Sequence, residues 1–91
     1  MTLPDFPTFR SQALARGFQE VLERRWEPGT VTGEHTHPFE ADALVVQGEM
    51  WLTVQGATDH LRPGGRFNIA AGIPHAEVYG PEGAVYWVAR R

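Results

Sequence analysis

The chain has 91 residues, enough for one small domain and too few for two. Its formal net charge of -3 argues against a nucleic-acid partner, and the lack of cysteine excludes disulfides and thiolate metal ligands. No apolar run approaches the ~20 residues that span a bilayer and no secretory signal is visible, so we expect a cytoplasmic protein without a membrane partner.

The start of the chain differs in pattern from the rest. Residues 1–17 are predicted to form an N-terminal arm, and residues 18–91 the main body of the domain. Within the arm, Thr8 is expected to cap a short helix over residues 9–15, whose apolar residues fall near helical spacing. Gly17 is expected to end this helix.

From residue 18 onward the sequence consists of short apolar or alternating runs separated by Gly and Pro turn signals. Their spacing predicts about eight antiparallel strands in an all-β sandwich or barrel. The absence of long helices between the runs argues against a parallel α/β sheet. The predicted strands cover residues 18–26, 30–37, 43–47, 50–55, 58–62, 66–69, 75–79 and 84–89.

Two histidines, His35 and His37, are separated by one residue in a predicted strand. Residues i and i+2 of a strand point to the same face, so both imidazoles can reach one ion at ~2.0–2.1 Å. A His-x-His pair also occurs by chance on protein surfaces. The pair therefore becomes informative only through the residues spaced around it.

The histidines lie within two stretches of sequence that have marked residues at fixed intervals. The first run contains His35 and His37 between Gly29 and Gly48, and the second contains His75 between Gly64 and Tyr79. In order, the marked positions are Gly29, His35, His37 and Gly48, then Gly64, Ala70, Gly72, His75 and Tyr79. The two runs resemble the two sequence motifs of the cupin superfamily, in particular its small single-domain, conserved-barrel members.

The resemblance implies a single-domain jelly-roll β-barrel with a short N-terminal helix or arm. It also implies one divalent transition metal ion inside the barrel, with Fe, Mn, Zn, Ni and Cu all occurring in the family. The family's usual ligands are three histidines and one glutamate. On this chain the resemblance assigns the histidine positions to His35, His37 and His75.

The fourth ligand is open, because Ala41 stands where the family has glutamate. Its neighbours Glu40 and Asp42 would need a bulge to turn inward, and are otherwise solvated turn residues. Glu77 shares strand parity with His75 and is a third candidate, as a ligand, as a partner orienting a histidine, or as a general base. The alternatives are a site of three histidines and water, or a Glu77 that meets solvent.

Several further side chains are candidates for the pocket, although aromatic residues in a small barrel also fill cores. Tyr79 stands where the family has asparagine and either offers its hydroxyl to a ligand or belongs to the core. His60 matches neither motif and is expected in solvent. The arginines at positions 24, 25, 90 and 91 are expected on the surface, although an arginine facing the cavity would matter for an anionic substrate. The candidate pocket residues are Phe39, Met50, Trp51, Tyr79 and Trp87.

Two functions fit these features. The domain is either a metal-dependent enzyme on a small molecule, such as an oxygenase, isomerase or hydrolase, or a non-catalytic small-ligand-binding or sensor cupin, in one version metal-free. Nothing in the sequence identifies the small molecule. Leu44 and Val46 are expected to face outward, which predicts a homodimer that covers them.

Overall fold

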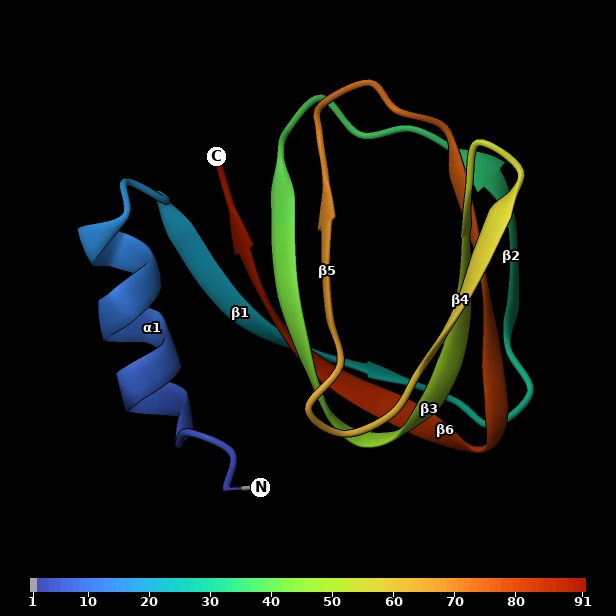
Figure 1. The fold of residues 1–91 in the computed structure, drawn as a ribbon, viewed down its shortest axis with the longest axis horizontal. Coiled ribbons are helices and arrows are strands. Elements are labelled where there is room, and N and C mark those ends of the chain that lie inside the picture. The colour runs from blue at the N-terminus through green and yellow to red at the C-terminus, as the bar shows by residue number, and fades with distance from the viewer. Residues whose placement is uncertain (1) are drawn as a thin grey trace.

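The computed structural model describes residues 2–91, and across them the chain forms one helix and six strands (Figure 1). Residue 1 of the predicted arm lies outside the described residues. Every strand pair is antiparallel, and α1 lies outside the barrel beside β1. The elements are α1 (Phe6–Ala15), β1 (Glu20–Trp26), β2 (Val31–His35), β3 (Ala41–Val54), β4 (Ala57–Leu61), β5 (Arg66–Ile69) and β6 (His75–Arg90).

The two longest strands, β3 and β6, organise the barrel because each takes part in both of its halves. The first part of β6, residues 75–79, pairs with β2 and with the last part of β3. The second part of β6, residues 84–90, pairs with β1 and with the first part of β3. Strands β4 and β5 pair with the last and first parts of β3. This arrangement confirms the predicted all-β barrel with a short helix.

The predicted number of strands is wrong, because two pairs of predicted strands are each one continuous strand. Gly48 lies within β3 and Gly83 within β6, both with positive φ, +69° and +72°. The register of β3 against β6 shifts on either side of Gly48, as in a β-bulge. Both strands therefore bend sharply and continue where the sequence predicts a turn.

Glycine is required at both bends because the backbones cross closely there. A Cβ on Gly48 would overlap the carbonyl oxygen of Gly83, and a Cβ on Gly83 would overlap the carbonyl oxygen of Trp26. Strands β1, β3 and β6 thus meet where only main chain fits between them.

The helix begins earlier than predicted, and its cap is Asp5 rather than Thr8. The Asp5 carboxylate accepts a hydrogen bond from the Thr8 N–H at 2.9 Å. This contact lowers the pKa of Asp5, because it favours the ionised acceptor. Phe6 and Phe9 of the helix pack on the indole of Trp87. Within residues 2–91, no helix has the length and apolar character needed to cross a membrane.

The dimer was predicted because Leu44 and Val46 were expected to be exposed on the outside of the barrel. Leu44 is only 2% exposed and lies opposite Trp87, against which α1 packs, so the expectation that it faces solvent is wrong. Val46 is half-buried. The homodimer stays a prediction, without the surface that suggested it.

Replacing Gly83 with alanine is expected to destabilise the barrel more than replacing Gly29. Both glycines have nearly equal positive φ, +72° and +71°, so alanine carries similar backbone strain of about 1–2 kcal/mol at either position. At Gly29 a Cβ meets nothing within 4 Å, whereas at Gly83 it meets main chain.

Urea denaturation should therefore show a loss of about 1–2 kcal/mol for Gly29→Ala and of at least about 3 kcal/mol for Gly83→Ala. Equal losses in the two variants would contradict the close crossing of β1 and β6.

Candidate metal centre

Three histidines converge at one end of the barrel, although they come from distant parts of the sequence. His35 is the last residue of β2 and lies opposite His75, the first residue of β6. His37 lies beyond the end of β2, not within the strand as predicted. Its carbonyl accepts a hydrogen bond from the Gly72 N–H at 2.8 Å, which ties the two histidine-bearing segments together.

The three side chains form the group that could hold a metal ion within residues 2–91. One ligand atom from each of His35, His37 and His75 lies within 4.8 Å of the other two. An ion at ~2.0–2.1 Å from each nitrogen fits between them if the rings move inward by about 1 Å. Side-chain adjustment alone is sufficient for a shift of this size.

Backbone carbonyls orient two of the imidazoles. The Nδ1 atom of His35 lies 2.7 Å from the Gly33 carbonyl oxygen, and the Nδ1 atom of His75 lies 3.0 Å from that of Ile73. A carbonyl can only accept, so each Nδ1 carries a proton, and in the neutral ring the lone pair is then on Nε2. This is the orientation in which metal-binding histidines are usually held.

The third histidine, His37, is biased toward its neutral form. Burial lowers the pKa of His37, and the neighbouring His75 and His35 lower it further. Its ring stacks on Phe39, with centroids 4.8 Å apart. At neutral pH, His37 therefore offers an unprotonated nitrogen for a cation.

One carboxylate reaches this group, and it belongs to Glu77. The side chain is buried, and its Oε2 lies 3.6 Å from the Nε2 of His35. Two hydroxyls donate to it, Tyr79 at 3.1 Å and Thr32 at 3.2 Å. Burial raises the pKa of Tyr79 well above its ordinary value, so the phenol keeps the proton that it donates.

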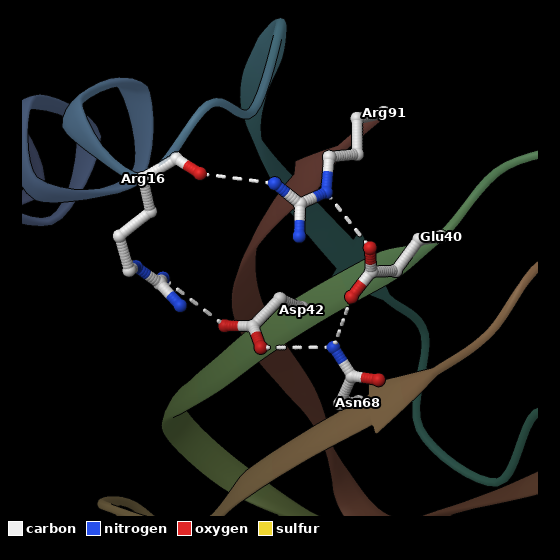
Figure 2. Close-up of polar contacts among 5 residues, drawn as sticks. All are labelled: Arg16, Glu40, Asp42, Asn68 and Arg91. Carbon is white, nitrogen blue, oxygen red and sulfur yellow. Dashed lines mark hydrogen bonds and ion pairs between the residues drawn. The ribbon is translucent and has the colours of Figure 1, made fainter.

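The other two carboxylate candidates, Glu40 and Asp42, do not line the cavity, and Figure 2 shows their contacts with Arg16, Asn68 and Arg91. Glu40 binds Arg91 and Asn68, each at 2.8 Å, and the bond from Asn68, followed by that from Arg91, lowers the pKa of Glu40. Asp42 binds Asn68 at 3.1 Å and Arg16 at 3.3 Å. No bulge turns either carboxylate toward the histidines.

Ala41, between these two, faces inward as its strand parity predicts, and lines a cavity of about 170 Å³ beside the histidines. Arg24 and Arg90, which were expected on the surface, also line this cavity. The full set of lining residues is Arg24, His37, Phe39, Ala41, Phe67, Ile69, His75, Glu77, Tyr86, Val88 and Arg90.

The predicted pocket residues separate into three groups. Phe39 lines the cavity, whereas Met50 and Tyr79 are buried in the hydrophobic core. The pocket prediction is wrong for Trp51, which stacks on His60 of the neighbouring β4, and for Trp87, which packs against α1. His60 is bound to Glu49 at 2.7 Å, away from the metal-binding group.

The position of Arg24 could have been predicted from the sequence. Arg24 lies two residues from both Leu22 and Trp26 in a predicted strand, so strand parity places the three side chains on one face.

Comparisons with known proteins bear on the fold of the chain. No family model matches the chain. The chain is similar to the HTH-type transcriptional regulator PuuR of Escherichia coli and of Shigella flexneri, with 42% identity over 57 residues, or 62% of this chain. These residues correspond to 31% of PuuR, so the chain spans less than a third of the curated relatives it matches.

Solved structures show the same fold. An RmlC-like cupin from Shewanella frigidimarina has a TM-score of 0.69 and 23% identity, covering 77% of this chain and 62% of that one. A structure of the DMSP lyases RdDddP and RnDddQII has a TM-score of 0.72 and 29% identity over 78% of this chain and 37% of that one. The oxalate decarboxylase of Bacillus subtilis, with Mn(II) centres, has a TM-score of 0.69 and 24% identity, covering 77% of this chain and 20% of that one.

The antiparallel barrel and these likenesses define a jelly-roll β-barrel of the cupin type. The chain therefore has the fold of a small cupin domain, as the spacing of its histidines predicts.

Addition of Mn²⁺ or Zn²⁺ is expected to raise the melting temperature of the parent protein. At a metal concentration about 100 times Kd, binding stabilises the folded state by about 2.7 kcal/mol, which corresponds to roughly 10–20 °C for a chain of this size. His35→Ala and His75→Ala should abolish the shift in differential scanning fluorimetry, because each removes one of three ligands.

His60→Ala is the matched control, since His60 lies outside the group. A full metal-dependent shift in the His35→Ala or His75→Ala variant would show that the ion binds elsewhere.

Proposed function

We propose that this cupin domain binds one divalent transition metal ion through His35, His37 and His75, and uses it to act on or bind a small molecule in the barrel. The observation that carries the proposal is the hydrogen bonding of the imidazoles. His35 and His75 have their Nδ1 atoms held by carbonyls, which leaves both Nε2 atoms free beside His37.

Glu77 is the carboxylate that we assign to this centre. It comes from β6 rather than from position 41 on β3, but its Oε2 lies 3.6 Å from His35 Nε2, on the inner face of the barrel. A buried carboxylate is costly unless it is paired, and two hydroxyls do not neutralise it. A divalent ion at the histidines would compensate this charge, with Glu77 as a direct ligand or as a counter-charge beside the ion.

The donor set of imidazole nitrogen and carboxylate oxygen suits Fe, Mn, Zn, Ni and Cu. When bound, such an ion supplies Lewis acidity toward a small molecule in its open positions. The chain itself holds the ligands in place, keeps a protonated phenol at Tyr79, and encloses the small molecule in a cavity of about 170 Å³. Metal-dependent oxygenase or isomerase chemistry is one use of this arrangement.

A sensor role is the second candidate, because the curated relative is a transcriptional regulator. In that case the small molecule would bind at the same metal and cavity but would not be converted. Metal analysis of the purified protein tests the shared part of both candidates. Recovery of an added small molecule unchanged, together with a ligand-dependent structural change, would favour the sensor.

Glu77→Gln is expected to weaken metal binding about 10- to 100-fold, the range seen when a ligand's supporting partner is lost. The amide keeps the shape of the side chain and one of its two acceptor oxygens, but removes the charge that compensates the cation. Competition with a chelating dye would measure the affinity, and the EPR spectrum of bound Mn²⁺ would report a changed ligand field.

Glu49→Gln is the matched control, because Glu49 is a half-exposed carboxylate bound to His60 on the outer side. Equal affinities for the parent and Glu77→Gln would remove Glu77 from the centre and leave the three histidines as its ligands.

A further inference from the structure

The cavity beside the histidines contains more positive charge than negative. Arg24 and Arg90 line it, and Glu77 is the one carboxylate among its described lining residues. The three histidines are neutral when they hold a metal, and a bound divalent ion adds further positive charge. A neutral or cationic ligand gains nothing from such a field, whereas an anion does.

The two arginines differ in how they are engaged. Arg90 pairs with Glu20 and lies over the ring of Phe39, 4.7 Å from its centroid. Arg24 lies over the ring of Trp26, 4.8 Å from its centroid, and among residues 2–91 no carboxylate oxygen lies within 4.0 Å of its guanidinium. The Arg24 guanidinium is therefore positioned by the Trp26 ring, and its positive charge has no carboxylate partner among the described residues.

The surroundings of Arg24 are rich in hydrogen-bond donors. Arg24 lies opposite Tyr86, whose hydroxyl is kept protonated because burial raises the pKa of that side chain. Trp26, two residues along the same face of β1, has a buried indole N–H beside the Tyr86 hydroxyl. Of these two residues, Tyr86 lines the cavity together with Arg24.

We propose that Arg24 binds the carboxylate of a small organic acid in the barrel cavity, with Arg90 adding to the positive field and the ligand's other end facing the metal site. This inference rests on the proposed function for the metal end and on Arg24 alone for the acid end. A guanidinium recognises a carboxylate through two parallel hydrogen bonds, which a neutral amide does not match in strength.

The cavity volume limits the size of the acid. A cavity of about 170 Å³ holds several water molecules and suits a small organic acid. Malonate and succinate are therefore suitable probes, because one carboxylate can reach Arg24 while the other faces the histidines.

The test is isothermal titration calorimetry of the parent protein, with and without bound Mn²⁺, against malonate and succinate. Malonamide is the neutral analogue, 1,3-diaminopropane the cationic one, and inorganic phosphate the alternative anion. We expect the acids to bind and the neutral and cationic analogues not to bind. A parent that binds neither acid, or binds phosphate alone, overturns the proposal.

Arg24→Gln should weaken acid binding at least about tenfold, with Mn²⁺ affinity unchanged within about twofold. Arg24→Lys keeps the charge and should restore part of the affinity. Arg25→Gln is the matched control, because it removes a positive charge from the next residue of β1, which is exposed and pairs with Glu23 at 2.9 Å. Circular dichroism establishes that each variant is folded.

Acid binding by folded Arg24→Gln at the parent's affinity overturns the proposal. A parent that fails to bind Mn²⁺ instead overturns the proposed metal function. In that case the titration of the metal-free protein still decides the role of Arg24, so the two failures are distinguishable.

Discussion

The close crossing of three strands at Gly48 and Gly83 is the constraint on which this barrel depends. Because no side chain separates the backbones there, β3 and β6 bend and pair on both sides of the bend, with a shift of register between the two parts. Each long strand then contributes to both halves of the barrel. The first part of β6 supplies His75 and Glu77 to the cavity, and the second part supplies Tyr86 and Arg90. One bend thus brings the two chemical halves of the cavity onto a single strand.

The cavity combines a buried carboxylate, oriented imidazoles and uncompensated arginine, each of which is costly alone in a small protein. A chain of 91 residues has a modest core with which to offset such costs. A bound cation and a bound anion would compensate one another and the protein groups together. The same charge arrangement would suit a catalyst and a sensor equally, since both need the ligand to bind selectively before anything else follows.

Much of the site was predictable because strand parity and motif spacing are local properties. Parity places Ala41, Glu77 and Tyr79 inward, and the structure agrees at all three positions. The same rule assigns Trp51 to the opposite face from Met50, and Arg24 to the face of Leu22 and Trp26, so these two corrections needed no further information.

Other features depend on contacts between distant segments and could not be predicted in this way. Leu44 is buried opposite Trp87, on which a helix from the start of the chain packs. Residues 80–83 carry strong turn signals, yet β6 runs through them as one strand. Glu40 and Asp42 are held outside by Arg91 and Arg16, which are far away in sequence.

The hydrogen bond from the Gly72 N–H to the His37 carbonyl joins the loop before β6 to the segment after β2. Two of the three histidines therefore share one main-chain link, and a movement of this loop would displace both. Its amide proton is consequently a natural reporter of the site: its exchange with solvent measures how often the mouth of the barrel opens, independently of what the barrel holds.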